Sequence, residues 1–378
     1  MYKIAHISDT HIRNLKYHDD YRAVFKQLYQ TLRKEQPDYI VHCGDLAHTK
    51  TQLSPEYFDL ASEFLDNLGN IAPLIVILGN HDGNLKNESR EDAVSPIVKA
   101  LNNPNITLLK DSGEYSPVEG LTFNVLSVFD RDNWIKPSSP SSINIALYHG
   151  SISGCLTASG WAMDMGDDTG SIFKDHDYAM LGDIHRTQSL DSEGRVRYCG
   201  STIQQNFSEG PRKGYLIWEI EDKDTFSVRK TSLINPRPFI TVHLEAGKLP
   251  DTHVPKNARL RLISRKSIDV HRLRKACDMA RSRWSPHSVT FLNRNESDAL
   301  TSKQTLSNTV QENLRDITIQ EKYIREYLKD YELEDEVMDE VLNYNKKYNQ
   351  KAEETDEVSR NVVWKIKKLK WNNFFNYG

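Results

Sequence analysis

The first 235 residues alternate short apolar runs with longer amphipathic stretches. The apolar runs predict buried strands at Tyr2–Ile7, 39–42 and 74–78. Apolar residues three or four positions apart predict amphipathic helices over 19–36 and 55–68. Strand and helix in alternation predict a layered α/β core. Further strands are predicted at 121–128, 143–148, 178–181, 196–199 and 214–220.

A boundary is predicted at Pro236-Arg237-Pro238, where two prolines interrupt the pattern. Beyond it, strands are expected at 239–244, 259–263 and 288–291, with a helix from about 269 to 284. These elements predict a small α+β domain.

The C-terminal part is polar with one helical stretch. Apolar residues from Ile324 to Tyr344 recur at helical spacing, and residues 361–378 are basic and aromatic. The predicted organisation is a core over 1–235, a basic domain over 236–295, a linker with acidic helices over 296–360 and a tail over 361–378.

The charge of the chain is uneven along its length. Its 378 residues carry a net charge of −4, which shows no general preference for nucleic acid. Residues 256–283, however, contain ten Lys or Arg and two acids, whereas 310–357 contain fifteen acids and seven bases. A charge run is usually a solvated face, but a basic run beside a catalytic core also suits phosphate backbones.

The sequence predicts a cytoplasmic protein with no membrane segment. No apolar run approaches the roughly 20 residues that a membrane-spanning helix needs. The N-terminus begins directly in a strand pattern, without a signal-peptide core. The four cysteines lie far apart, which argues against a disulfide framework.

Five polar motifs each follow a predicted strand, where ligands bind in α/β proteins. They are Asp9-Thr10-His11, Gly44-Asp45, Gly79-Asn80-His81-Asp82, His149-Gly150 and Gly182-Asp183-Ile184-His185. Carboxylate, imidazole and amide donors on several strand ends can hold two divalent cations, with one carboxylate bridging them. Glycines beside Asp45 and Asn80 allow the sharp turns that bring these side chains inward.

Each motif alone is weak evidence. A single Asp after a strand is more often a helix cap, and a lone His within a strand, such as His6 or His42, is better interpreted as a core residue. All five motifs in this order favour a metal site over packing.

In this order the motifs resemble the signature of calcineurin-like metallophosphoesterases. Three longer stretches are similar to the SbcD-type nucleases, the DNA-cleaving subunits of SbcCD complexes. These stretches are 44–48, 181–188 and 198–207, with Lys213-Gly214-Tyr215 beyond them. The resemblance implies a layered two-sheet metallophosphoesterase core, a small α+β DNA-capping domain and a C-terminal helical segment.

The resemblance also implies a role for each site residue. Asp9, His11 and His185 would hold one cation, Asn80, His149 and Asp183 the other, and Asp45 would bridge them. His81 would contact the scissile phosphate or protonate the leaving oxygen, oriented by Asp82, and His48 would help to place the DNA strand. The implied cations are Mn²⁺, with Mg²⁺ as the alternative.

Asp183 departs from the family pattern, which commonly has GHxH where this chain has Gly182-Asp183-Ile184-His185. Aspartate is a hard oxygen ligand, so the exchange should favour Mn²⁺ or Mg²⁺ over softer metals. We therefore expect a working site with an altered metal preference or turnover.

The basic domain matches the family's DNA-capping domain in position and size. Its expected DNA-backbone contacts are Arg259, Arg261, Arg265, Lys266, Arg272, Arg274 and Lys275. Trp284 is better interpreted as a core residue than as a stacking platform.

The resemblance implies three partners: double-stranded DNA ends, an SbcC-type ABC ATPase and a second copy of the chain. The acidic helices would bind the ATPase coiled coil, although a hairpin packed on its own chain is an equal alternative. Residues 361–378 resemble the opening strand of such an ATPase, as in a fusion, or alternatively form an amphipathic tail.

The sequence thus predicts a metal-dependent DNA exonuclease or endonuclease that processes DNA ends and hairpins in an SbcCD-like complex. One alternative is a phosphodiesterase or phosphatase for small molecules. Another is a weakly active scaffold that binds DNA ends, an alternative that Asp183 keeps open.

Overall fold

The computed structural model describes residues 1–50, 53–85, 87, 90–245, 247–264, 268–293, 317–328 and 335–355. The chain divides into two compact units, one formed by Met1–Ile263 with Val270–Leu292 and the other by Ser264–Asp269 with Asn293–Gly378. The predicted tail and residues 296–316, 329–334 and 356–360 of the predicted linker with acidic helices lie outside the described residues.

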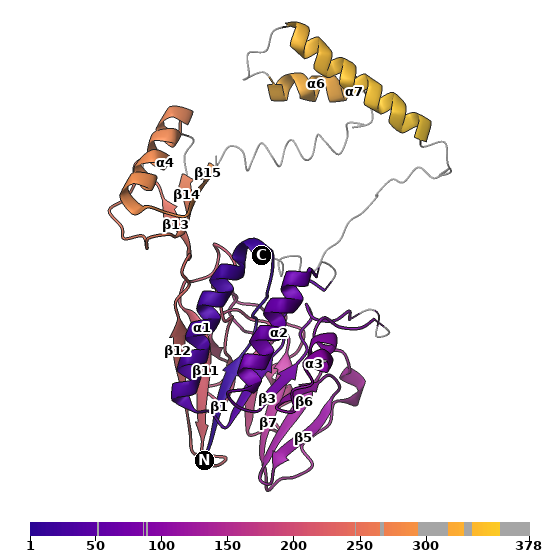
Figure 1. The fold of residues 1–378 in the computed structure, drawn as a ribbon, viewed down its shortest axis with the longest axis vertical. Coiled ribbons are helices and arrows are strands. Elements are labelled where there is room, and N and C mark those ends of the chain that lie inside the picture. Colours follow the sequence, from indigo (N-terminus) through magenta and orange to yellow (C-terminus); the bar gives the residue numbers. More distant parts are fainter. Residues whose placement is uncertain are drawn as a thin grey trace. The chain divides into compact units, whose positions relative to one another are not determined.

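Two six-stranded sheets form the core of the first unit (Figure 1). The first sheet has the order β12-β11-β1-β2-β3-β4 and the second the order β5-β6-β7-β8-β10-β9. The strands of the first sheet are β1 (Tyr2–Ile7), β2 (Tyr39–Cys43), β3 (Leu74–Ile77), β4 (Ile106–Leu109), β11 (Lys213–Ile220) and β12 (Phe226–Leu233). Those of the second are β5 (Gly113–Val118), β6 (Leu121–Leu126), β7 (Ile143–His149), β8 (Tyr178–Gly182), β9 (Gln188–Ser189) and β10 (Val196–Tyr198).

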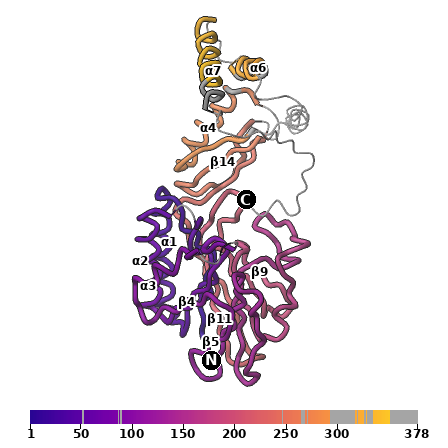
Figure 2. The backbone as a smooth tube through the Cα atoms, turned by 90° about the vertical axis from the view of Figure 1, so that its right-hand side faces the viewer, coloured from indigo at the N-terminus to yellow at the C-terminus, as the bar shows by residue number. Residues whose placement is uncertain are grey.

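Helices cover the first sheet on the face turned away from the second sheet (Figure 2). They are α1 (His18–Glu35), α2 (Pro55–Gly69) and α3 (Ser95–Leu101), with short 3-10 turns η1 (Leu15–Tyr17), η2 (Arg131–Asn133) and η3 (Gly170–Phe173) elsewhere. One apolar cluster lies between α1, α2 and the first sheet, and a second lies between the sheets around Trp218 and Phe123. This layering confirms the predicted two-sheet α/β core.

Parallel strands carry the predicted motifs to one edge. β1 pairs in parallel with β2, and β2 with β3, while β7 pairs in parallel with β8. The carboxyl ends of parallel strands meet at the same edge of a sheet, so the loops after these five strands converge.

A third sheet of order β13-β14-β15 lies in the part of the chain where the small α+β domain was predicted. Its elements are β13 (Phe239–His243), β14 (Arg259–Ser264), α4 (Val270–Trp284) and β15 (Ser288–Asn293). Ala276, Ala280 and Trp284 are buried at a spacing of four residues, so one face of α4 packs inward. Trp284 is thus a core residue, as predicted.

The described part of the second unit consists of α6 (Ile317–Leu328) and α7 (Asp335–Thr355). Asn349 of α7 donates to the Gln320 side-chain oxygen of α6 at 2.7 Å. The predicted helical segment is therefore a pair of contacting helices. Within the described residues, no helix is long and apolar enough to span a lipid bilayer.

A buried ion pair joins the small domain to α1. Asp20 accepts from Arg259 at 2.6 Å and lies 3.1 Å from Arg237, and only 2% of Asp20 is exposed. Arg259 also lies over the rings of Tyr17 and Phe239. The small domain is therefore fixed to the core by charge and aromatic contacts together.

Replacing Asp20 with Ala should lower the free energy of unfolding by about 3–5 kcal/mol, because it leaves a buried guanidinium unpaired. The neighbouring Asp19→Ala is a matched control: the Asp19 side chain is 82% exposed and 3.8 Å from Arg237, so little change is expected. Urea denaturation of the two variants measures the difference. Equal stabilities would contradict the buried ion pair.

Candidate metal centre

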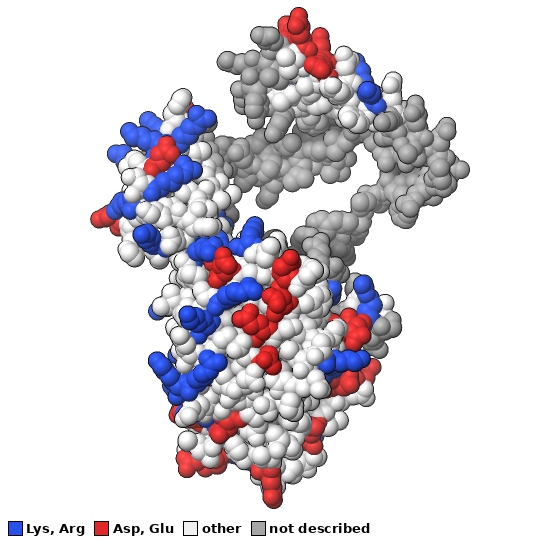
Figure 3. Space-filling model, viewed as in Figure 1, with Lys and Arg blue, Asp and Glu red and all other residues white. Residues whose placement is uncertain are grey.

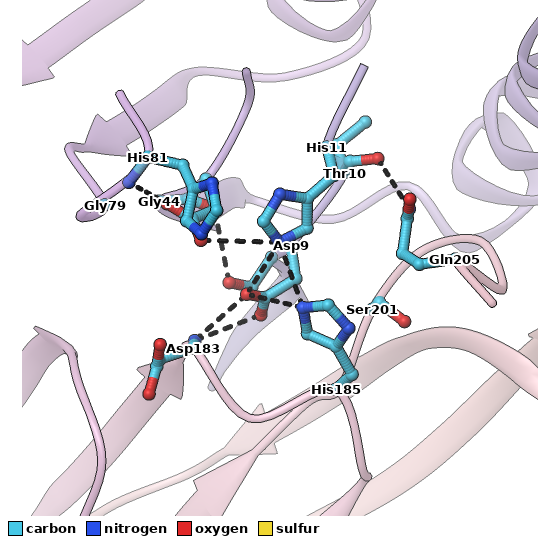
Figure 4. A network of polar contacts seen from close by, with 12 residues as sticks. Asp9, Thr10, His11, Gly44, Gly79, His81, Asp183, His185, Ser201 and Gln205 are labelled. Carbon is cyan, nitrogen blue, oxygen red and sulfur yellow. Dashed lines mark hydrogen bonds and ion pairs between the residues drawn. The ribbon is translucent and has the colours of Figure 1, made fainter. Parts of the chain in front are cut away.

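The five motifs meet in one buried cluster (Figure 4). Three overlapping groups have ligand atoms within 4.8 Å of one another: Asp9 with His11 and His185, His11 with Asp45 and His81, and Asp9 with Asp45 and His149. These residues lie up to 176 positions apart in the sequence, from Asp9 to His185, and only the fold brings them together.

Asp45 lies between two halves of the cluster. Its Oδ2 is 3.4 Å from His11 Nε2 and 3.3 Å from His149 Nε2. On the first side, His11 Nε2 is 2.9 Å from His185 Nε2, and both nitrogens are within 3.8 Å of Asp9 Oδ1. Asp45 therefore occupies the position that a bridging carboxylate needs.

The second half of the cluster centres on His149 Nε2. This nitrogen is 3.3 Å from the Asn80 side-chain oxygen and 3.9 Å from Asp183 Oδ1. Asp183 also donates its backbone N–H to Asp9. The structure thus brings Asn80, His149 and Asp183 together on one side of Asp45, and their role as ligands of a second cation stays a prediction.

Hydrogen bonds at Nδ1 orient three of the histidines. His149 Nδ1 donates to the Cys43 carbonyl at 2.7 Å, His81 Nδ1 to the His48 carbonyl at 2.7 Å, and His185 Nδ1 to Glu209 at 2.8 Å. With the Nδ1 proton in these bonds, the neutral ring presents its Nε2 lone pair to the cluster. Carboxylate oxygens and imidazole lone pairs aimed at common points are a donor set that fits divalent cations.

The backbone around the cluster is strained. Among the described non-glycine residues with positive φ are Asp9 (53°), His11 (47°), Asp45 (58°) and Asp183 (93°). Non-glycine residues adopt this region at a cost, and such strain concentrates at functional sites. The packing also demands glycine at position 79, because a Cβ there would lie 2.2 Å from Asp45 Oδ1.

Burial of several carboxylates together shifts their pKa values. Burial is the main cause that raises the pKa of Asp183 to about 7, and the charges of the neighbouring Asp9 and Asp45 act in the same direction. Burial alone would lower the pKa of His149, but the Asp45 carboxylate beside it raises that pKa well above its usual value. The site therefore concentrates negative charge that cations can neutralise.

His81 and His48 lie on the rim of the cluster. Their rings stack with centroids 6.1 Å apart, and both are half-buried. Their contact with the substrate stays a prediction. His81 also lies close enough to Asp45 and His11 to reach a cation.

Asp82 does not orient the His81 ring, and this part of the prediction is wrong. Its buried carboxylate accepts from the backbone N–H groups of Asp45 at 2.8 Å, Ala47 at 2.8 Å and Gly79 at 3.0 Å. The carbonyl of His48 holds the His81 ring instead. Asp82 therefore shapes the backbone that carries Asp45.

The isolated histidines of the strands are core residues, as interpreted from the sequence. His6 and His42 are fully buried, and burial lowers the pKa of each to about 3. His6 contacts the Leu181 carbonyl and His42 the Thr10 hydroxyl.

The sequence that forms this fold and site matches a known protein family. Residues 2–195 match the family model of the calcineurin-like phosphoesterases, which covers more than half of the chain. The chain therefore belongs to the calcineurin-like phosphoesterase family, whose members use divalent metals.

Individual relatives share between 26% and 38% of the aligned residues with this chain. Uncharacterized protein R555 of Acanthamoeba polyphaga mimivirus is 38% identical over 275 residues, which are 69% of this chain and 20% of that protein. The D subunit of nuclease SbcCD is 29% identical over 256 residues in Staphylococcus epidermidis and 26% over 253 residues in Staphylococcus saprophyticus. Each of these two alignments covers 58% of this chain and 66% of the relative, so the chain spans less than two thirds of the proteins it matches.

Glu209 is a buried member of the centre that the sequence did not reveal. It accepts from His185 Nδ1 and is paired with Lys213 at 2.7 Å. Burial alone would raise its pKa, but His185 and Lys213 lower it to about 2, so it stays ionised. In the sequence, Glu209 lies between two stretches that resemble the nuclease family, 198–207 and 213–215. This position is the one feature of the sequence that could have pointed to it.

Replacing Glu209 with Gln should weaken divalent-metal binding by about 10–100-fold, because the carboxylate that fixes the His185 tautomer is lost. Calorimetric titration with Mn²⁺ measures the affinity. The control is Glu221→Gln, an exposed acid in the turn after β11. Unchanged affinity in the Glu209 variant would remove its link to the centre.

Proposed function

We propose that this chain is a DNA nuclease that depends on two divalent cations, Mn²⁺ or Mg²⁺, and processes DNA ends and hairpins. The observation that carries the proposal is the position of Asp45 between two sets of metal-ligand donors. The distant similarity to two relatives named as the D subunit of nuclease SbcCD supports DNA as the substrate.

The two halves of the cluster divide the proposed ligands. Asp9, His11 and His185 would hold one cation, and Asn80, His149 and Asp183 would hold the other. Divalent cations held there would neutralise a phosphodiester and lower the pKa of a water molecule that attacks phosphorus. Family membership supports divalent metals, and the hard oxygen ligand Asp183 favours Mn²⁺ or Mg²⁺.

His81 is the proposed general acid. Its Nδ1 is bonded to the His48 carbonyl, so Nε2 is the nitrogen that can deliver a proton to the leaving oxygen. The half-buried His48 ring stacks on His81 and would guide the substrate strand past it.

The small basic domain is the proposed duplex-binding surface. Lys and Arg side chains gather on its outer face (Figure 3), and Arg272, Arg274 and Lys275 of α4 are all at least partly open to solvent. Two other exposed cations are paired with acids, Arg281 with Asp278 and Arg283 with Asp251. The outer side of α4 is therefore the part best suited to phosphates.

The remaining predicted DNA contacts differ from these three. Arg259 is 7% exposed and ion-paired with Asp20, so its prediction as a DNA contact is wrong: it is used inside the protein. Arg261 donates to the Thr241 hydroxyl and lies over the Phe207 ring, so it too serves packing. Arg265 and Lys266 lie outside the described residues.

The paired helices of the second unit suit the proposed ATPase partner. Val337, Tyr344 and Tyr348 of α7 are 43–66% exposed and fall at spacings of seven and four residues. An apolar stripe of this kind on an acidic helix fits another helix, such as the coiled coil of an SbcC-type ATPase. The domain boundaries and dimerisation stay predictions.

Replacing Asp45 or His149 with Ala should abolish Mn²⁺-dependent cleavage of linear duplex DNA, because Asp45 lies between both halves of the cluster and His149 is the centre of the second half. Gel analysis of a labelled duplex measures the rate. Asp38→Ala is the control, since its carboxylate bonds the backbone of Lys3. Cleavage within a few-fold of the parent would refute the two-metal assignment.

The substrate of the parent protein separates the alternative functions. Hydrolysis of nucleotide esters without DNA cleavage would favour a small-molecule phosphodiesterase. DNA binding without cleavage would favour a scaffold.

Replacing Arg272, Arg274 and Lys275 with Ala should weaken duplex binding about equally for all sequences. Each lost phosphate contact should also reduce the slope of log affinity against log salt by about 0.9. Hydrolysis of bis(p-nitrophenyl) phosphate serves as the control and should be unchanged. Unchanged duplex binding would mean that this face of α4 is only in contact with solvent. A loss of ester hydrolysis would mean that these residues support the core.

A further inference from the structure

A loop that follows the ligand candidate His149 in the chain presents a large aromatic side chain to solvent. The loop, residues 151–168, starts two residues after His149 and is called here the Trp161 loop. Trp161 at its tip is 54% exposed, although most large aromatic side chains of the core are buried. None of the roles proposed above for the metal centre uses Trp161.

The Trp161 loop is held by many hydrogen bonds. At its base, the Ser151 hydroxyl donates to Asp167 at 2.6 Å and the Ser153 N–H donates to the Asp168 carbonyl at 2.9 Å. At its tip, the Thr157 N–H donates to the Trp161 carbonyl at 2.8 Å, and the Trp161 N–H donates to the Thr157 hydroxyl at 3.2 Å. The exposed indole is therefore attached to an ordered support.

The tip of this loop lies against the segment that carries His185. Gln188 clamps Leu156 with two bonds, accepting from its N–H at 2.8 Å and donating to its carbonyl at 2.7 Å. Next to the tip, a Cβ on Gly160 would lie 3.4 Å from the guanidinium of Arg186. Arg186 directly follows the ligand candidate His185 and is exposed.

We infer that Trp161 and Arg186 form a nucleotide-binding edge, in which the indole stacks on a nucleobase and the guanidinium contacts a backbone phosphate. The inference rests on the proposed function and adds how the substrate strand is held. Indole rings stack on any base without reading sequence, while a guanidinium suits a phosphate.

The edge fits an unpaired strand better than an intact duplex. A base inside a duplex is stacked on both faces and cannot lie on an indole until it is released. An exposed Trp on a loop that starts beside His149 therefore favours frayed ends, hairpin loops and single strands. The Trp161 loop starts two residues after His149, and Arg186 directly follows His185, so the edge joins the two segments that carry these ligand candidates.

The test compares Trp161→Ala, Trp161→Leu and Trp161→Phe in the full-length chain, with two single-stranded probes. One probe is a labelled oligonucleotide, and the other has the same length and phosphates but only abasic sugars. Trp161→Ala and Trp161→Leu should weaken binding of the normal strand by about 5–100-fold, whereas Trp161→Phe should retain most of the affinity. Binding of the abasic strand should be the same for all three variants and the parent.

Arg186→Ala should weaken binding of both strands and reduce the slope of log affinity against log salt by about 0.7, the value for one contact on a single strand. Val118→Ala removes a 42%-exposed apolar side chain near the amino end of β6, away from the motif-bearing ends, and serves as the control. The rise in melting temperature on adding Mn²⁺ should be retained in every variant, which shows that the metal centre is intact.

The outcomes separate this inference from the proposed function. Cleavage of DNA by the parent, with equal affinities for Trp161→Ala and the parent, overturns the nucleotide-binding edge and leaves the nuclease proposal standing. Equal losses on normal and abasic strands also overturn the stacking role. If the parent neither binds nor cleaves any strand, both proposals fail together. A loss confined to the normal strand and reversed by Phe supports the edge.

Discussion

Several carboxylates of like charge lie close together in one buried pocket, and the arrangement of the site depends on how their charge is neutralised. Asp9 and Asp45 are almost completely buried, and Asp183 lies within the same cluster. Carboxylates this close repel one another, and burial raises the pKa of Asp183 to about 7. Divalent cations relieve both costs at once, which gives the arrangement a physical reason that packing alone does not.

The surrounding fold is arranged to aim donors at that pocket. Carbonyl oxygens of Cys43 and His48 and the carboxylate of Glu209 hold the Nδ1 sides of three histidines. Asp82 accepts three backbone N–H bonds and so supports the loop that carries Asp45. Residues behind the ligands therefore fix the geometry, as is usual for metal sites.

The basic stretch of the small domain serves two purposes. Arg259 and Arg261 stabilise the domain through Asp20, Thr241 and Phe207. The outward-facing cations of α4 remain open to solvent, where phosphates can reach them. A count of positive residues along the sequence does not distinguish these uses, because burial and pairing are decided by the fold.

The order of the main strands and helices and the set of candidate ligands could be predicted from the sequence alone. Apolar runs marked β1, β2, β3, β7 and β8, because buried parallel strands are continuously apolar. It did not reveal β5 or β12, whose alternating exposed positions leave only a weak apolar signal. Other features follow only from the three-dimensional fold. Asp45 lies between His11 and His149, and Glu209 supports His185. Asp82 accepts hydrogen bonds from the backbone, and Arg259 is buried in an ion pair. These are contacts between residues distant in sequence, and local pattern carries no information about which side chains meet across a closed core.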